Sequence, residues 1–303
     1  MWALSRPGNR MQSAPPAPDP VDLDHVGFIV PELQAAQALF DGLGFTLTAR
    51  AAHTKRDAQG RVVSAGSAQH SVMFDTGYIE LMQITDPQAG HQLTPAMRER
   101  FGLHVLALGT PDATACHAAR QRAGLEVGAV MDWSRAVSTP ERSGLARFLY
   151  FDTRWSPGDP SYLCWVHHAT PELVRSPSLL RHANGALSLR GLHYAGPRAA
   201  LPAWGGRLRQ AGAQAPAGFD GEGRLILGAS WIELHADEAM TRVLPVGMTL
   251  GFSALGPLRA AAARLGLPMA TRAEGAVDID LGAACGLVLH AVQETAPKAA
   301  APG

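Results

Sequence analysis

The sequence has few cysteines and no long apolar run, and each shortage excludes a class of protein. Its three cysteines, Cys116, Cys164 and Cys285, are widely separated and form no CxxC pair. This spacing argues against a disulfide framework or a zinc ribbon and fits a reducing compartment. No apolar stretch approaches the roughly 20 residues that a membrane span needs. We therefore expect a cytoplasmic protein that does not enter a membrane.

An excess of charge of one sign is also missing. The 303 residues include 26 basic and 26 acidic side chains and no run of Lys or Arg, so the sequence lacks the electrostatic footprint of a nucleic-acid binder. GxSxG, P-loop and HExxH motifs are absent as well, which excludes the serine hydrolases, nucleotide phosphoryl transferases and zincin proteases that carry them. We expect a small-molecule partner, no nucleic acid, and a monomer or homodimer.

What the sequence does contain is a degenerate repeat. From Leu23 it reads LDHVGFIVPELQAAQALFDGLGF, which predicts a strand, a Pro, a helix with Leu33, Ala36 and Phe40 at i, i+3 and i+7, and a Gly stop. The segments HSVMF and GYIELMQI complete a βαβββ unit. Similar units start at LHVLALG, RGLHYAG and MTLGFSA. One such unit leaves a sheet face open, so units should pair into a curved sheet around a cleft.

We therefore predict an α+β fold of four βαβββ modules, paired into two pseudo-symmetric curved-sheet domains. A segment with two prolines and an Asn-Gly separates the pairs, and both ends of the chain have the composition of flexible tails. The expected boundaries are a disordered arm at 1–20, an N-terminal module pair at 21–172, a connector at 173–187, a C-terminal module pair at 188–294 and a disordered tail at 295–303.

Three polar residues interrupt the apolar strands of the first pair. His25 and His104 stand near the start of first strands, and Glu80 stands in the middle of a last strand between Ile79 and Leu81. Alternate strand residues share a face, so Glu80 should face the cleft while its two neighbours pack under the helix. A buried carboxylate needs a partner. Two imidazoles and a carboxylate form the facial triad typical of non-haem Fe(II), and we predict that these three residues bind a metal.

Other residues of the first pair are candidates for contact with a substrate. Gln69, Tyr78 and Tyr162 should face the cleft and are predicted to bind substrate, while His168 could act as a general acid or base near neutral pH. Structural roles are the alternatives: an ordinary polar strand residue for Gln69, core packing for Tyr162, and the cap of a turn for His168.

The sequence also resembles a known family. DHVGFIVPEL, GYIELMQ and LHVLALGTPD look like strand motifs of the vicinal oxygen chelate superfamily, and WVHHATPEL followed by RHANGALSL resembles its glyoxalase-like domain branch. The superfamily binds metal through a first-strand His and a last-strand Glu, which implies His25, Glu80 and His104 here. Its members include glyoxalases, extradiol and hydroxyphenylpyruvate-type dioxygenases, epimerases and metal-free drug-binding proteins.

The sequence departs from the family pattern at two places. Tyr78 and Tyr162 are 84 residues apart in corresponding strands, and this register puts Cys164 where four-ligand glyoxalases carry a carboxylate. The C-terminal pair retains His193 and Glu233 but has Val288 at the last Glu position and no His in MTLGFSA. We therefore expect the C-terminal pair to be mainly structural, although four-module dioxygenases usually keep their working site in that half.

The resemblance and the three-ligand count favour a non-haem Fe(II) ring-cleaving, extradiol-type dioxygenase that acts on a small vicinally oxygenated compound. A redox-neutral lyase, isomerase or epimerase that uses Mn, Zn, Ni or Mg at the same site is the first alternative. A metal-free protein that binds a small molecule or confers resistance is the second.

Overall fold

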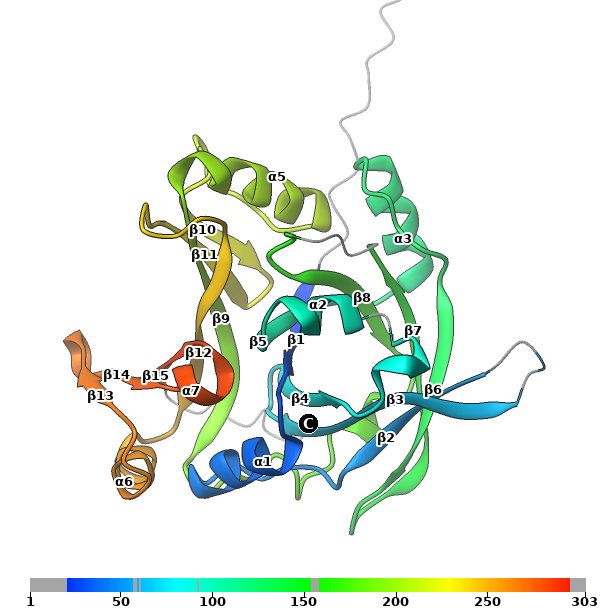
Figure 1. The fold of residues 1–303 in the computed structure, drawn as a ribbon, viewed down its shortest axis with the longest axis horizontal. Helices are drawn as coiled ribbons and strands as arrows, with labels where there is room; N and C mark the ends of the chain where they lie inside the picture. Colours follow the sequence, from blue (N-terminus) through cyan, green and yellow to red (C-terminus); the bar gives the residue numbers. More distant parts are fainter. Residues whose placement is uncertain (1–20, 57–58, 60, 92, 154–157, 295–303) are drawn as a thin grey trace, which may run out of the picture.

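The computed structural model describes residues 21–294 except 57, 58, 60, 92 and 154–157. It contains two curled β-sheets with helices packed against them, which is the predicted α+β class (Figure 1). The arm and the tail that we expected to be disordered, 1–20 and 295–303, lie outside the described residues.

Two βαβββ modules build the N-terminal sheet, whose strand order is β2-β3-β4-β1-β5-β8-β7-β6. The first strands β1 and β5 pair antiparallel at the centre, and each last strand runs parallel to the first strand of its own module. The elements are β1 (Asp22–Ile29), α1 (Leu33–Gly42), β2 (Ala51–Arg56), β3 (Val62–Met73), β4 (Tyr78–Ile84), η1 (Pro87–Ala89), α2 (Thr94–Glu99), β5 (Gly102–Gly109), α3 (Ala113–Arg122), β6 (Met131–Ser138), β7 (Ser143–Asp152) and β8 (Tyr162–His168).

The C-terminal sheet repeats this plan in the order β10-β11-β9-β12-β15-β14-β13. It begins at Ala186, two residues before the predicted boundary of the second pair. The elements that follow β8 are α4 (Pro171–Val174), β9 (Ala186–Gly196), η2 (Arg198–Ala200), α5 (Leu201–Ala211), β10 (Gly223–Leu227), β11 (Ser230–Ala236), β12 (Leu244–Phe252), α6 (Gly256–Arg264), β13 (Met269–Thr271), η3 (Ala273–Gly275), β14 (Val277–Asp280), α7 (Gly282–Cys285) and β15 (Val288–Gln293).

The third module is shorter than predicted. It forms βαββ, with β9, α5, β10 and β11, where the repeat predicted βαβββ. A single antiparallel bridge between Gln214 and Ile226 stands where a further strand was expected. The segment that approaches this bridge, from Gly212 to Gly221, contains Pro216 and three glycines with positive φ or turn geometry, a composition that does not sustain a strand.

A single continuous core joins the two sheets. The helix α1 buries Leu33, Ala36 and Phe40 as its spacing predicted, and these side chains share a cluster with Ile79 and Leu81 of β4. The same cluster extends into the C-terminal sheet and its helix α5. Polar contacts reinforce the junction, because the Trp165 indole N–H donates to the carbonyl of Ala211 at 3.2 Å. The helix-covered faces of both sheets therefore pack toward a common centre.

We call the opposite face of each sheet its inner face. In the N-terminal sheet this face is partly covered, because Leu93 and Ala96 at α2 pack with a cluster that includes Met82, Val105 and Cys164. A second cluster places Val174 of α4 with Met73, Tyr78 and Ala146. The polar residues of this face therefore lie between two apolar covers. On the inner face of the C-terminal sheet, Ile226 is 41% exposed.

Candidate metal centre and polar sites

The side chains of β4 alternate between the helix-covered core and the inner face, as the sequence predicted. Ile79 and Leu81 are buried in the core with α1, and Met82 belongs to the inner-face cluster. A Cβ placed on Gly27 would lie 3.5 Å from Oε2 of Glu80, which puts this carboxylate on the inner face across from the middle of β1. Glu80 therefore faces the cleft as expected.

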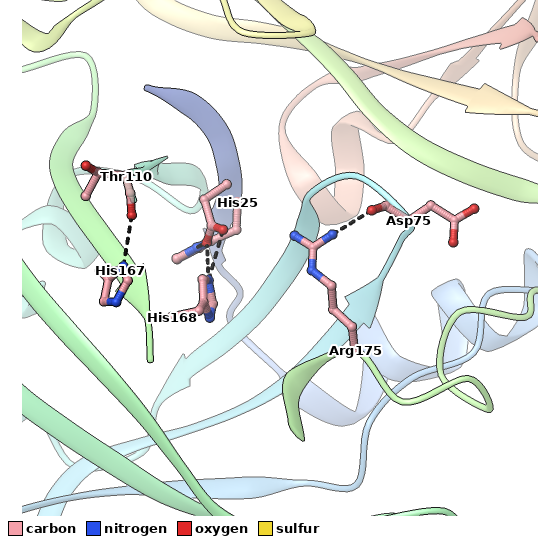
Figure 2. A network of polar contacts seen from close by, with 7 residues as sticks. His25, Asp75, Thr110, His167, His168 and Arg175 are labelled. Atoms are coloured by element: carbon pink, nitrogen blue, oxygen red, sulfur yellow. Dashed lines mark hydrogen bonds and ion pairs between the residues drawn. The ribbon is translucent and has the colours of Figure 1, made fainter. Parts of the chain in front are cut away.

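His25 also lies on the inner face, but its nearest polar partner is its neighbour in sequence. The Nδ1 atom lies 2.7 Å from Oδ2 of Asp24, and Nε2 of His168 lies 2.9 Å from Oδ1 of the same carboxylate (Figure 2). The His25 ring stacks on Tyr78 with 4.2 Å between ring centroids. Asp24 therefore contacts both imidazoles.

Asp24 is ionised in this arrangement. Its burial alone would raise the pKa of the carboxyl, but hydrogen bonds from His168 and His25 outweigh burial and hold the pKa of Asp24 well below its usual value. A buried carboxylate at the centre of two imidazoles is a charge-assisted hydrogen-bond network. We did not predict a role for Asp24, although its position beside His25 in the sequence could have suggested one.

Glu80 contacts a different histidine from those expected. Nε2 of His53 on β2 lies 3.8 Å from Oε1 of Glu80 and 2.8 Å from Oε1 of Gln69, and Nδ1 of His53 lies 2.6 Å from the Ser67 hydroxyl. Gln69, a predicted substrate ligand, is therefore already hydrogen-bonded within the protein, and it is buried. Glu80 and His25 belong to two separate polar groups on the same face.

The structure does not bring His104 together with His25 and Glu80. The Nε2–H of His104 donates to the carbonyl of Arg100 at the end of α2, at 2.9 Å. Burial and the nearby Arg100 guanidinium lower the pKa of His104 to about 4. Its surroundings are those of a neutral, buried structural histidine.

The physical reason is a β-bulge that shifts the register by one residue. In the β1–β5 ladder, Gly27 pairs with Val105 but Phe28 pairs with Leu103, so that His104 is the extra residue. His25 pairs with Tyr78 on β4, and the residue that pairs with Tyr162 on β8 is Val105. Val105 is thus the true counterpart of His25. The sequence already contained this signal, because Pro31 and Pro111 are 80 residues apart whereas His25 and His104 are 79 apart.

The position equivalent to Glu80 is occupied by Cys164, as predicted from the tyrosine spacing, and Cys164 is buried. Burial, together with the carboxylates of Asp152 and Glu80, raises the pKa of this thiol well above its usual value. A protonated thiol is a poor metal ligand. Tyr162, a predicted substrate ligand, hydrogen-bonds through its hydroxyl to Asp152 and to Tyr150, so it too is satisfied within the protein.

Two other histidines of this half hold the chain in place. His182 in the connector accepts a hydrogen bond from the backbone N–H of Thr46 at 2.9 Å, and its Nε2–H donates to the carbonyl of Met73 at 2.7 Å. His167 contacts the carbonyl of Thr110 at 3.2 Å (Figure 2). The same figure shows Arg175 donating to the Asp75 carbonyl, which ties the segment after β8 to the turn before β4.

A cluster suited to a metal ion lies instead in the C-terminal sheet. Among the described residues, His193, Glu233 and His235 form the one group of three whose potential ligand atoms all lie within 4.8 Å of one another. Nδ1 of His193 is 3.2 Å from Nε2 of His235 and 3.8 Å from Oε2 of Glu233. Ligand atoms about 2.1 Å from one ion are roughly 3 Å apart, so these separations fit a shared ion.

The strand register explains the cluster. Glu233 on β11 pairs directly with His193 on the parallel strand β9, and His235 is the next residue of β11 on the same face. The sequence had identified His193 and Glu233 but had not identified His235. The two-residue step in IELHA could have revealed it, because GLVLHA in the fourth module repeats the same ending.

The protonation state of His193 suits a ligand. Its Nε2 lies 3.0 Å from the Thr249 hydroxyl, which can accept the ring N–H and leave the Nδ1 lone pair directed at His235 and Glu233. Burial and the neighbouring imidazoles of His290 and His235 lower the pKa of His193 to about 3. A metal-binding imidazole must be neutral, and His193 is neutral throughout the ordinary pH range.

Arg224 borders the cluster on the β10 side. Its guanidinium is 3.1 Å from Oε2 of Glu233 and lies over the Trp231 ring, 4.1 Å from the ring centroid. Trp231 in turn covers Gly191, where any Cβ would come within 2.4 Å of the indole. These contacts orient the Glu233 carboxylate beside a rigid aromatic wall.

On the other side, the fourth module contributes His290. Nδ1 of His290 is 2.7 Å from Oδ1 of Asp278, and the His290 ring lies 4.4 Å from that of His193. Gly247, which pairs with His193 on one side and Val288 on the other, makes room for this ring, because its Cβ would lie 2.6 Å from Nε2 of His290. The fourth module thus has neither the Glu nor the His of the family pattern, but it supplies the imidazole of His290.

The donor set fits a divalent ion. It consists of two imidazoles and one carboxylate on one open face, which is the facial arrangement of non-haem Fe(II) and related ions. The side chains of His193 and Glu233 are 15% and 25% exposed, so a small molecule can reach them. The C-terminal pair, which we expected to be mainly structural, therefore contains a set of potential metal ligands.

Paired βαβββ modules with His and Glu on adjoining strands define the architecture of the vicinal oxygen chelate superfamily. The chain belongs to its glyoxalase-like domain family, because the model of that family matches residues 23–209. A comparison with curated proteins gives no match.

Solved structures share the fold at low identity. A hypothetical protein from Staphylococcus aureus is 12% identical over 90% of this chain and 100% of its own, with a TM-score of 0.64. A mutant of 4-hydroxymandelate synthase from Streptomyces coelicolor is 13% identical over 94% of each chain, with a TM-score of 0.53. The 2,3-dioxygenase LapB from Pseudomonas sp. KL28 is 11% identical over 92% of this chain and 94% of its own, with a TM-score of 0.50.

Two further observations bound the functional surface. In the part of the chain that the structure describes, no helix has the length and apolar character to cross a membrane.

A cavity of about 1240 Å³ lies between α3 and α5, where Gly124, Pro202, Arg207 and Phe219 help to line it. It shares no residue with either polar cluster.

Proposed function

We propose that this protein is a divalent-metal-dependent enzyme whose ion is held in the C-terminal module pair by His193, His235 and Glu233. The observation that carries the proposal is the convergence of these three side chains, whose ligand atoms lie within 4.8 Å of one another. This site replaces the one that the sequence predicted with His25, Glu80 and His104.

The favoured ion is Fe(II), and the favoured reaction is oxidative cleavage of a small compound with two neighbouring oxygen atoms. A facial set of two imidazoles and one carboxylate leaves positions open for substrate and O2, and an ion held there would act as a Lewis acid toward vicinal oxygens. Two solved enzymes share the fold, and they are named as a 4-hydroxymandelate synthase and a 2,3-dioxygenase. That likeness supports the choice of reaction class.

The residues around the site have defined tasks in this proposal. Thr249 accepts the Nε2–H of His193 and so directs Nδ1 toward the site. Arg224 holds Glu233 in place and neutralises part of its charge. Asp278 orients His290, whose ring lies against His193, and so keeps a second imidazole at the edge of the substrate space.

A redox-neutral lyase, isomerase or epimerase that uses Mn, Zn, Ni or Mg is the second candidate, because the same donor set accepts these ions. Metal identity and O2 consumption separate the two reaction classes. A metal-free binding protein is the third candidate, and it requires that the purified protein hold no ion at this cluster.

The test is an activity assay on protein loaded anaerobically with Fe(II), in which O2 consumption is followed with a panel of catechols and 2-oxo acids. We expect turnover by the wild type and a loss of at least 100-fold in His193→Ala and Glu233→Gln, since each removes one ligand. The matched control is Glu80→Gln, which alters the corresponding Glu of the other domain and should retain activity. Turnover without O2 uptake, on any metal, would select the redox-neutral class, and equal activity in all three variants would refute the site.

A further inference from the structure

The N-terminal module pair keeps the family architecture but not the family donor set. Two first-strand and two last-strand positions meet on its inner face, and they are occupied by His25, Val105, Glu80 and Cys164. Valine has no ligand atom, and the buried Cys164 thiol is held in its protonated form by burial and by the carboxylates near it. Only an imidazole and a carboxylate remain, and they are engaged with different partners.

We infer that the N-terminal pair is a metal-free ligand site, in which Asp24 holds His25 so that Nε2 accepts a hydrogen bond from the hydroxyl of a small, uncharged phenol-like compound. This inference concerns a different domain from the proposed metal centre and does not depend on it.

The first support is the tautomer of His25. Asp24 is a carboxylate and can only accept, so the proton between them sits on Nδ1 of His25, at 2.7 Å. In the neutral ring, Nε2 then carries the lone pair. Among the described residues no side chain or backbone group bonds to this Nε2. His168 donates to the other oxygen of Asp24 at 2.9 Å, so the carboxylate cannot swing away.

The second support is the chemistry around this acceptor. The His25 ring lies on Tyr78 at 4.2 Å, and the ring of Phe148 lies 5.3 Å from that of His168, so the acceptor is set among aromatic faces. Apolar side chains of α2 and α4 cover the inner face on both sides of the polar strip. A flat aromatic ligand matches such walls.

The third support is the local charge. The carboxylates of Asp24 and Glu80 raise the pKa of Tyr78. The same two carboxylates and that of Asp152 raise the pKa of Cys164. One cation, that of Arg135, acts on Tyr78 in the opposite direction; it lies over the Phe148 ring, 5.8 Å from its centroid, and forms no ion pair with Asp24 or Glu80 among the described residues. Several carboxylates disfavour an anionic ligand, and a neutral hydroxyl donor suits the lone pair of His25.

The experiment reads the imidazole nitrogens of 15N-histidine-labelled full-length protein by NMR. The first measurement adds one equivalent of Mn2+ to the wild type. We expect the His25 and His168 signals to stay sharp, whatever happens at His193 and His235. Broadening of His25 by Mn2+ would overturn the metal-free assignment, and this result is separate from the fate of the C-terminal site.

The second measurement titrates phenol into the wild type, Asp24→Asn and the exposed-site control Asp41→Asn. We expect phenol to shift Nε2 of His25 in the wild type and in the control, with binding at least tenfold weaker in Asp24→Asn because the tautomer is no longer fixed. Equal phenol binding by Asp24→Asn would contradict the role of Asp24. A larger shift with benzoate or with butylammonium than with phenol would contradict the ligand class.

Discussion

Glu233 lies directly across from His193 on neighbouring parallel strands, so that the two side chains leave the sheet at the same point. In the N-terminal sheet, the residue directly across from Glu80 is Gly27, and His25 is two residues away along β1. The same pair of residue types therefore converges in one domain and diverges in the other. This difference in register decides which half of the chain has a metal-type donor set.

The first prediction concerns His104 and the pH dependence of stability. Its pKa is lowered to about 4 in the folded protein, against about 6.5 in an unfolded chain. Between these values the unfolded state binds the proton more readily, so the free energy of unfolding should fall as pH drops from about 6.5 to 4, by on the order of 3 kcal/mol from this residue. Above pH 7 its contribution is constant.

His104→Gln tests this prediction, because glutamine can still donate to the Arg100 carbonyl but does not titrate. Urea unfolding between pH 4 and 7 should show a flatter pH profile for His104→Gln than for the wild type. His167→Gln, at a partly exposed histidine, is the control and should follow the wild type. Parallel profiles for His104→Gln and the wild type would show that His104 does not carry this pH dependence.

The second prediction concerns the carboxyl of Asp24, which titrates in the opposite sense. Burial would raise the pKa of Asp24, but hydrogen bonds from His168 and His25 lower it below the usual value of about 3.9. The stabilisation is therefore present above about pH 4 and is lost as pH falls toward the folded-state pKa. Asp24→Asn should be less stable near neutral pH by roughly 2 kcal/mol.

Acid unfolding followed by circular dichroism checks the Asp24 prediction. As pH falls below about 4, the stability of Asp24→Asn should gradually approach that of the wild type, because the unfolded wild-type carboxyl then takes up a proton while the folded carboxyl stays ionised. A constant difference between the two proteins across the acid range would mean that Asp24 does not titrate with folding.

The third prediction uses the close approach at Gly247. An alanine Cβ there would lie 2.6 Å from Nε2 of His290 and 3.3 Å from Cδ2 of His193, so the His290 ring, held by Asp278, would have to move. Gly247→Ala should therefore displace His290 from His193 at a stability cost below about 1 kcal/mol, while the turnover number falls by about tenfold or more.

Gly206→Ala is the matched control for this substitution. Gly206 lies in α5, and nothing lies within 4 Å of the position that its Cβ would take. Alanine in a helix interior is more favourable than glycine by about 0.5–1 kcal/mol, so this variant should gain stability and keep full activity. If Gly247→Ala also kept full activity, the ring of His290 would have no part in the reaction.

Much of the fold could be predicted from the sequence because its signals are local and periodic. The spacing of Leu33, Ala36 and Phe40 specified the buried face of α1, and the alternation around Glu80 specified which side of β4 faces the core. The spacing of Tyr78 and Tyr162 correctly made Cys164 the counterpart of Glu80.

The convergence of the predicted ligands could not be judged from the sequence, because it depends on the register between distant strands. Bulges in the β1–β5 ladder leave Asp24 and His104 as extra residues, and one extra residue exchanges the faces of a strand. Asp24 was consequently overlooked and His104 was paired with His25. His235 and His290 were missed because each stands two residues beyond the expected Glu position of its module, and their contacts with His193 depend on strand register.

The most direct test of the account is the metal content of two matched variants, Glu233→Gln and Glu80→Gln, after identical anaerobic loading with Fe(II) and removal of unbound ion. Each replaces the last-strand glutamate of one domain by its isosteric amide. We expect one ion per chain in the wild type and in Glu80→Gln, and less than a tenth of an ion in Glu233→Gln. Loss of the ion from Glu80→Gln with retention in Glu233→Gln would contradict the account and place the metal in the N-terminal domain.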